Sequence, residues 1–226
     1  FSMRAPVVCV SLEAREEGVF RGMPLGRALK RCPDLQVLPP DPEAAEKISH
    51  HLARTAAQYT PLWEPSRPGH LYLDLTGTQR LWGRVEDAAY RLVREVRQRF
   101  SLPGNVGVAG NKMVSQLASR RMAYREVGLV SPGQEAKFMA PLPVGMIPGV
   151  GQDRRKILTE ELRIQKAGQL AALDGTLLGL IFGSRAGVIR QRALGVDPTP
   201  VFPTARRPLI SASAPLPEED NDDERL

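Results

Sequence analysis

Hydrophobic residues along the chain follow two different spacings. In three segments, apolar residues recur every three to four positions, which is the spacing of one face of a helix. In five others, apolar residues alternate with polar ones or form a short run, which is typical of a strand. The helical segments begin at Pro42, Val85 and Asn111, and the strand segments are residues 6–11, 35–38, 62–66, 70–76 and 105–109. Because most of them succeed one another within residues 35–122, we predict an α+β layer with a mixed or antiparallel sheet and helices against one face.

The C-terminal part of the chain has a different pattern. After about residue 131 the strand patterns stop, and residues 152–195 contain several short helical segments broken by glycines. Residues 197–217 are rich in proline and lack periodicity, which predicts a linker. We therefore expect a domain boundary near residues 130–145, between a mixed domain and an all-helical one.

Composition excludes several classes of protein. Apolar residues make up 42% and charged residues 25% of the 226 residues, which is typical of a globular chain. No apolar stretch reaches the roughly 18 residues of a membrane helix, and the first residues do not resemble a signal peptide. Two cysteines, Cys9 and Cys32, are too few for a disulfide scaffold, so we expect a cytoplasmic protein with no membrane partner.

The charge of the chain is unevenly distributed. The net charge is +6, but residues 218–226 hold six acidic residues and one arginine, which leaves 30 basic and 19 acidic residues in residues 1–217. A body with this excess attracts polyanions through Coulomb forces and counterion release. A soluble surface rich in arginine explains the same count, so charge alone leaves both interpretations open.

One short motif, Gly107-Val-Ala-Gly-Asn-Lys112, joins a predicted strand to a predicted helix. The N-terminus of a helix offers unpaired backbone N–H groups, Asn111 can cap it, and Lys112 adds a full positive charge. This combination suits a phosphate group, although it is not a Walker A loop. A capped helix with one exposed lysine is the alternative, and local sequence favours that simpler interpretation.

A second motif lies in the helical region, where a turn with two glycines (Ile147-Pro-Gly-Val-Gly151) precedes a predicted helix from Gln152 to Leu162. Glycines allow such a turn to approach another backbone closely and to direct its N–H groups outward. Three cations in the first turn of that helix oppose its dipole, and contact with DNA phosphates would explain them. With a second short helix at Ala167–Leu173, the segment has the outline of a helix-hairpin-helix, and the alternative is a solvated basic face. The predicted DNA-binding residues are Gly149, Val150, Gly151, Arg154, Arg155 and Lys156.

Other catalytic or metal-binding chemistry finds no support in the motifs. The three histidines, His50, His51 and His70, lack the spacing of an HExxH or similar metal site. The chain also has no GxSxG nucleophile elbow and no credible cysteine–histidine pair.

Seven ordered blocks of sequence together carry a resemblance to a known family. They are SLEARxxGVxRGMPL from Ser11, CPDL from Cys32, YTPLWEP from Tyr59, LYLDLTG from Leu71, VGVAGNKxxSxLAS from Val106, PLPV from Pro141 and IPGVG from Ile147. In this order the chain resembles a Y-family translesion DNA polymerase from about residue 6 to residue 200. The resemblance implies fingers in residues 1–41, a palm without its first strand in residues 42–130, a helical thumb in residues 131–196, and a linker with the start of a little-finger domain in residues 197–226.

The resemblance also locates a departure from active members of that family. Active members carry an Asp-Glu pair that binds the catalytic Mg²⁺ ions, and the matching positions here are Gly69 and His70. Glycine offers no ligand, and neutral imidazole is a poor ligand for Mg²⁺. Asp74 and Glu64 lie nearby in sequence, but Asp74 is about 17 Å along a strand from Gly69 and cannot simply replace the pair. We therefore expect no catalytic residues, no bound metal and no cofactor, with Mg²⁺ required only if the chain belongs to an active polymerase.

The residues that contact the triphosphate in this family are partly retained. Arg15 and Lys112 match two such positions, with Asn111 beside the second, whereas Leu12 replaces the usual tyrosine. These residues could bind a nucleotide or persist as structural charges, and the sequence leaves both options open.

The pattern resembles the catalytically degenerate branch of the family, the polymerase-like accessory subunits of bacterial mutagenic repair. The resemblance implies a DNA-binding, non-catalytic protein of DNA repair and damage tolerance within the SOS response, which grips DNA without sequence preference and is associated with the nucleoid when bound. Its expected protein partners are a replicative-type polymerase, a sliding clamp and a recombinase-like protein. The alternatives are an active error-prone translesion polymerase with an atypical metal site, and a nucleotide-sensing or protein-interaction module. Whether the protein is an enzyme stays open, with the balance against catalysis.

Overall fold

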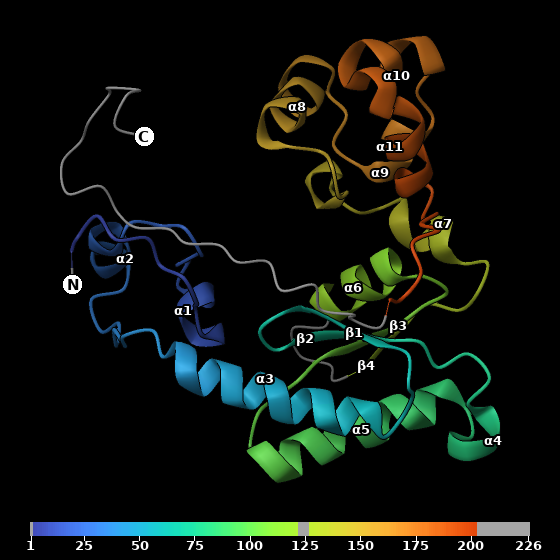
Figure 1. Ribbon diagram of the computed structural model, residues 1–226. Coiled ribbons are helices and arrows are strands. Elements are labelled where there is room, and N and C mark those ends of the chain that lie inside the picture. The colour runs from blue at the N-terminus through green and yellow to red at the C-terminus, as the bar shows by residue number, and fades with distance from the viewer. Residues whose placement is uncertain (1, 122–126, 203–226) are drawn as a thin grey trace, which may run out of the picture. The chain divides into compact units, whose positions relative to one another are not determined.

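The structure is a computed structural model that describes residues 2–121 and 127–202 (Figure 1). The chain divides between His51 and Leu52 into two compact units. The long helix α3 (Pro42–Ala57) contains this division, and it begins where the sequence predicts, with Asp41 Oδ1 accepting a hydrogen bond from the N–H of Ala44 at 2.8 Å. Within the described residues, no helix is both long and apolar enough to cross a membrane.

The first unit contains two short helices, α1 (Leu12–Glu16) and α2 (Leu25–Arg31). Its core consists of four buried residues, Ala14, Val19, Met23 and Ala28. The strand predicted at residues 6–11 is wrong: the segment forms a single bridge, between Pro6 and Pro24, beside which the N–H of Val7 donates to the carbonyl oxygen of Met23 at 2.9 Å. The strand predicted at residues 35–38 is also absent from the described structure, where these residues are irregular.

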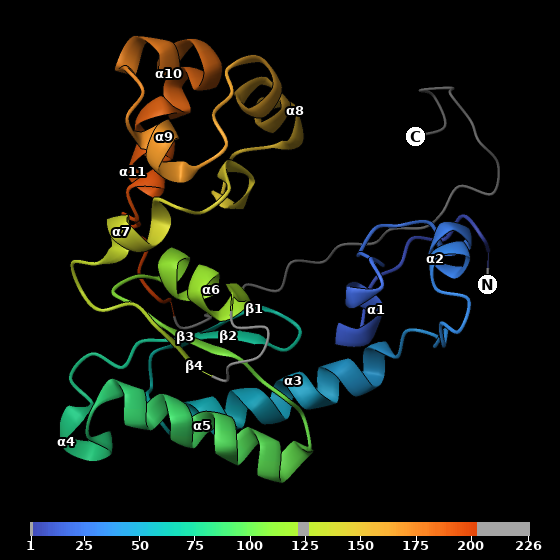
Figure 2. The ribbon, with the colours of Figure 1, turned by 180° about the vertical axis from the view of Figure 1, so that it is seen from behind.

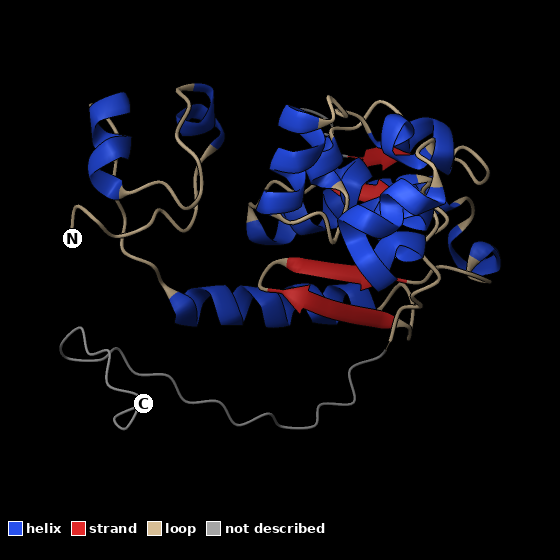
Figure 3. Cartoon of the chain, turned by 90° about the horizontal axis from the view of Figure 1, so that it is seen from above, coloured by secondary structure: helices blue, strands red, loops and turns tan. Residues whose placement is uncertain are grey.

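The second unit begins with an antiparallel hairpin of β1 (Trp63–Arg67) and β2 (His70–Leu73), in which Glu64 pairs with Tyr72 and Arg67 with His70. Helices α4 (Gln79–Trp82) and α5 (Val85–Phe100) follow, and then β3 (Val106–Val108), α6 (Lys112–Arg121) and β4 (Val127–Leu129). Strands β3 and β4 are parallel and form a second two-stranded sheet, which Figure 3 shows in red with the hairpin. The mixed α+β class is thus confirmed, whereas β4 was not predicted.

Helices cover both faces of the β3–β4 pair, which corrects the prediction that they lie against one face. Val106 and Val108 pack against Ala89 and Val93 of α5. Successive residues of a strand face opposite sides of the sheet, so Gly107 faces the side away from α5. A Cβ at Gly107 would lie only 1.8 Å from the carbonyl oxygen of Ser115 in α6. Figures 1 and 2 accordingly show α5 and α6 on opposite sides of these strands.

The remaining elements are all helical, as predicted. They are α7 (Glu135–Met139), a 3-10 turn (Val144–Met146), α8 (Gln152–Lys156), a π-helical turn (Ile157–Glu161), α9 (Ala167–Ala171), α10 (Gly175–Phe182), a 3-10 turn (Gly183–Arg185) and α11 (Ala186–Ala193). Their buried residues share one hydrophobic core with α6, whose Val114 and Leu117 are completely buried. Helix α6 therefore links the β3–β4 sheet to the helical region.

Tyr59 makes a pH-dependent contribution to stability in this unit. Its hydroxyl donates to Glu95 Oε2 at 2.8 Å, and its ring stacks on Trp82. Burial and, secondarily, the Glu95 carboxylate raise the pKa of Tyr59 to about 12. An unfolded tyrosine loses its proton near pH 10, so this contribution is complete below pH 10 and is lost as the pH rises to 12. We expect the free energy of unfolding to fall by roughly 2–3 kcal/mol across that interval.

Urea denaturation between pH 8 and pH 11.5 would measure this loss. The variant Tyr59→Phe should be less stable than the parent at pH 8, by about 1–2 kcal/mol, because it loses the hydrogen bond to a charged acceptor. It should also lose less stability on the alkaline side. Parallel pH profiles of the two proteins would contradict the assignment.

Candidate functional site

The N-terminus of α6 is held by Asn111, as the sequence predicts. Asn111 Oδ1 accepts a hydrogen bond from the N–H of Val114 at 2.9 Å, so the side chain caps the helix. Its Nδ2 donates to the carbonyl oxygen of Gly195 at 2.8 Å, which ties the start of α6 to the segment after α11. Asn111 thus has both of its polar groups engaged in structural contacts.

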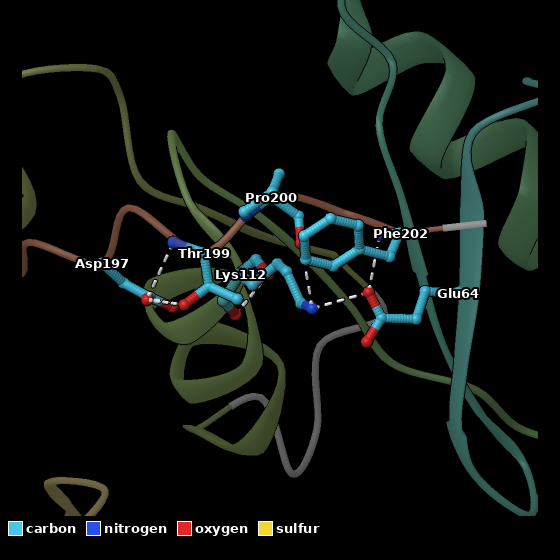
Figure 4. A network of polar contacts seen from close by, with 7 residues as sticks. Glu64, Lys112, Asp197, Thr199, Pro200 and Phe202 are labelled. Atoms are coloured by element: carbon cyan, nitrogen blue, oxygen red, sulfur yellow. Dashed lines mark hydrogen bonds and ion pairs between the residues drawn. The ribbon is translucent and has the colours of Figure 1, made fainter. Parts of the chain in front are cut away.

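Lys112 lies at the centre of a small polar network (Figure 4). Its Nζ is 2.6 Å from Glu64 Oε2 of β1 and 3.3 Å from the carbonyl oxygen of Pro200, and it lies 4.9 Å from the ring centroid of Tyr72. The N–H of Phe202 donates to the same Glu64 oxygen at 2.9 Å. The Lys112 side chain is only 13% exposed, so the alternative of an exposed capping lysine is wrong.

Glu64 is charged in this network. Burial alone would raise the pKa of the Glu64 carboxyl, but the hydrogen bonds from Lys112 and Phe202 and the charge of Lys112 outweigh it and hold the pKa below the usual value. The ion pair is therefore formed at neutral pH. The sequence did not predict this pairing, because Glu64 and Lys112 are 48 residues apart and no local motif connects them.

The positions that match the family's carboxylate pair lie at the turn of the β1–β2 hairpin. Gly69 has a φ of 72°, a left-handed conformation that favours glycine, and a Cβ there would meet no atom within 4 Å. His70 begins β2, and its Nδ1 is buried without a hydrogen-bond partner among the described residues. Burial, together with the positive charges of Arg67 and Arg120, lowers the pKa of the His70 imidazole. The imidazole of His70 is therefore neutral at pH 7.

Asp74 does not replace the missing carboxylates. Its Oδ1 accepts a hydrogen bond from the N–H of Thr76 at 2.9 Å, and its carbonyl oxygen accepts one from Thr60 Oγ1 at 2.7 Å, so it shapes the exit from β2. Within residues 2–121 and 127–202, no group of three or more His, Cys, Asp or Glu side chains could hold a metal ion. The residues of the hairpin do not fit a magnesium site.

Arg15 lies in the last turn of α1, in the first unit, and is exposed. Lys112 belongs to the second unit. A joint role of the two residues in binding a triphosphate stays a prediction.

The turn at Ile147–Gly151 approaches another helix closely, as its glycines predict. Gly149 has a φ of 96°, and a Cβ there would lie 2.9 Å from Ile189 Cδ1 of α11. Arg192, also of α11, donates to the carbonyl oxygen of Pro148 at 2.8 Å. Gly151, by contrast, is exposed and faces open space, and Val150 is half-buried between the two glycines.

The three cations after this turn have different surroundings. Arg154 Nε donates to the carbonyl oxygen of Ile181 at 3.2 Å, and its guanidinium lies 5.8 Å from the ring centroid of Phe182, so Arg154 supports the fold. Arg155 and Lys156 are exposed. The predicted continuous helix is wrong in detail, because α8 has only five residues and continues as a π-helical turn.

Comparison with known proteins decides the family. Residues 2–120 match the model of the impB/mucB/samB family. The chain belongs to this family. Among curated proteins, it is 34% identical over 199 residues to the DNA polymerase IV of Opitutus terrae, covering 88% of this chain and 51% of that protein. It is 32% identical over 218 residues to the DNA polymerase IV of Alkalilimnicola ehrlichii, covering 96% of this chain and 61% of that protein.

Solved structures support the same assignment. DinB from Sulfolobus solfataricus has a TM-score of 0.73 at 25% identity, covering 84% of this chain and 56% of that one. A ternary complex of Dbh has a TM-score of 0.70 at 25% identity, covering 83% and 56%. The resemblance to a Y-family translesion polymerase, including its palm, is therefore confirmed, and the chain spans about half the length of the curated relatives it matches. These comparisons do not single out the accessory branch.

The comparisons overturn one prediction. The expectation of no cofactor is wrong for a family whose relatives are named DNA polymerase IV, because polymerases transfer nucleotides with a pair of divalent ions. Mg²⁺ is accordingly the cofactor expected of the family. The hairpin around Gly69 and His70 departs from that expectation in its residues.

Proposed function

We propose that this chain is the DNA-binding part of a Y-family protein of DNA damage tolerance. In this part, the hairpin of β1 and β2 does not support nucleotide transfer. One observation carries the proposal. The hairpin turn is occupied by a left-handed glycine, Gly69, and by His70, whose Nδ1 is buried without a hydrogen-bond partner among the described residues. Neither residue offers a carboxylate oxygen, which is the ligand that Mg²⁺ prefers.

We propose that the turn at Ile147–Gly151 and the cations beside it bind DNA. Gly151 is exposed with free space around it, and Arg155 and Lys156 extend the same surface into solvent. An exposed turn followed by cations suits the phosphate backbone, which carries charge but no sequence information. The helix-hairpin-helix stays a proposal, with the turn and α9 (Ala167–Ala171) as its recognisable parts.

The wider organisation also belongs to the proposal. Fingers at residues 1–41, palm at 42–130, thumb at 131–196 and linker at 197–226 follow the resemblance, and part of the linker lies outside the described residues. A replicative-type polymerase, a sliding clamp and a recombinase-like protein are its proposed protein partners, and a cytoplasmic location follows from the same role.

A second candidate function, an active error-prone translesion polymerase, is favoured by the comparisons. Curated relatives carry the name DNA polymerase IV, and one solved neighbour is titled an error-prone polymerase. In that case carboxylates from other parts of the protein would have to complete a metal site near the hairpin. The names of the relatives support this candidate, whereas the residues at positions 69 and 70 support the first.

Primer extension separates the two candidates. With the intact protein, a labelled primer–template, all four deoxynucleotides and either Mg²⁺ or Mn²⁺, we expect no templated extension, even at enzyme excess. Extension that disappears on Asp74→Asn would establish the polymerase and refute the non-catalytic proposal. Binding of the same primer–template should be measured in parallel, so that a lack of extension is not confused with a lack of binding.

A further inference from the structure

We propose that residues 197–202, here named the strap, compete with phosphate for Lys112, so that the strap must leave before Lys112 can bind a phosphate group. The inference rests on the proposed function together with the prediction from the sequence that Lys112 contacts a phosphate group. The strap follows α11 and crosses the start of α6 (Figure 4).

Hydrogen bonds hold the strap, at successive points, to the rest of the second unit. Just before it, the Gly195 carbonyl oxygen accepts a hydrogen bond from Asn111. Within it, Asp197 Oδ1 accepts hydrogen bonds from the N–H of Thr199 at 3.2 Å and from Thr199 Oγ1 at 2.7 Å, which forms a local turn. After that turn, Pro200 and Phe202 make the contacts to Lys112 and Glu64 described above.

These contacts occupy the positions that a phosphate oxygen would take. An ammonium group has three N–H donors and no acceptor. Two of the Lys112 partners, Glu64 Oε2 and the Pro200 carbonyl oxygen, are already within hydrogen-bond distance, and the ring of Tyr72 lies on a further side. Since Lys112 is only 13% exposed, a phosphate cannot reach its Nζ without displacing the strap, Glu64 or both.

The strap is also suited to leave. It contacts Lys112 and Glu64 through backbone groups, and Phe202 keeps 59% of its surface exposed, so little apolar area opposes its release. Pro198 and Pro200 limit the conformations of the free segment, which lowers the entropy cost of docking again. A segment with these properties can exchange with a competing anion.

The first experiment measures access to Lys112 directly. The intact protein is treated with acetic anhydride, and the acetylation rates of Lys112 and of the exposed Lys47 are followed by mass spectrometry. Asp197→Ala removes the acceptor of both hydrogen bonds from Thr199 that shape the strap, and we expect it to raise the Lys112 rate about fivefold or more, without changing the Lys47 rate. The matched control Asp197→Asn removes the same charge but keeps the acceptor oxygen, and it should behave like the parent.

The second experiment measures competition. Binding of tripolyphosphate and of a primer–template is measured for the parent, Asp197→Ala and Asp197→Asn, with Lys112→Ala as a reference. We expect Asp197→Ala to bind tripolyphosphate about fivefold more tightly in a manner that requires Lys112. A gain confined to the primer–template would identify the DNA backbone as the source of the phosphate.

The results distinguish failure of this inference from failure of the proposed function. An unchanged Lys112 acetylation rate in Asp197→Ala refutes the strap as a cover. Faster acetylation with no gain in binding of either ligand refutes the competition and the phosphate role of Lys112 together. DNA binding through Arg155 and Lys156 would be unaffected by that second result, because it is measured separately.

Discussion

Replacing Gly107 by alanine is expected to lower the free energy of unfolding by roughly 3 kcal/mol or more. A Cβ at this position would lie 1.8 Å from the carbonyl oxygen and 2.8 Å from the carbonyl carbon of Ser115, and 2.8 Å from the backbone nitrogen of Ser119. These are backbone atoms of α6, so no side chain can rotate to relieve the clash. Helix α6 would have to move away from β3.

The cost is large because α6 is shared between two parts of the unit. It covers β3 on one side and contributes Val114 and Leu117, both completely buried, to the core of the helical region on the other. A displacement of the helix therefore opens packing in both places, and tightly packed interiors tolerate this poorly.

Urea denaturation followed by circular dichroism would measure the effect of Gly107→Ala. Gly104→Ala is a matched control three residues earlier, where a Cβ meets no atom within 4 Å and the φ is not positive, and it should change stability by less than about 1 kcal/mol. Equal stability of the two variants would show that α6 does not pack on β3 as described.

The long helices were predictable because their signals are local. Asp41 followed by Pro42 marks the start of α3, and the apolar stripe from Val85 to Phe100 matches α5 residue for residue. The strand β4 (Val127–Leu129) was missed because it is defined by pairing with its parallel partner β3, which lies about 20 residues away in the sequence. The segment at residues 6–11 was misread because an apolar run predicts burial but not a hydrogen-bonding partner.

The candidate site was predictable only in part, because some of its contacts join segments that are far apart in the sequence. The ordered motifs located Gly69, His70 and Lys112, and the structure adds the left-handed turn at Gly69 and the burial of His70 Nδ1. The contacts of Lys112 to Glu64 and Pro200 join segments 48 and 88 residues apart. Such contacts depend on the packing of α6 against its neighbours, which no local pattern records.

Reversing the charges of Arg155 and Lys156 is expected to weaken DNA binding by about tenfold or more at 100 mM salt, because two phosphate contacts become repulsive. Both side chains are exposed beside the turn at Ile147–Gly151. Arg154 is left unchanged, because its hydrogen bond to the Ile181 carbonyl and its position over Phe182 support the fold. A triple replacement that includes it would mix lost binding with lost stability.

Fluorescence anisotropy with a labelled primer–template between 50 and 200 mM salt would test the prediction. Each lost contact removes about 0.9 from the slope of log affinity against log salt, so Arg155→Glu with Lys156→Glu should flatten the slope by about two. The matched control, Arg80→Glu with Arg94→Glu, changes the net charge equally at exposed positions on α4 and α5. If both double variants lose the same affinity, DNA responds only to the overall charge of the protein. A loss confined to Arg155 and Lys156 instead assigns the contact to the turn before α8, because the control removes the long-range part of the attraction.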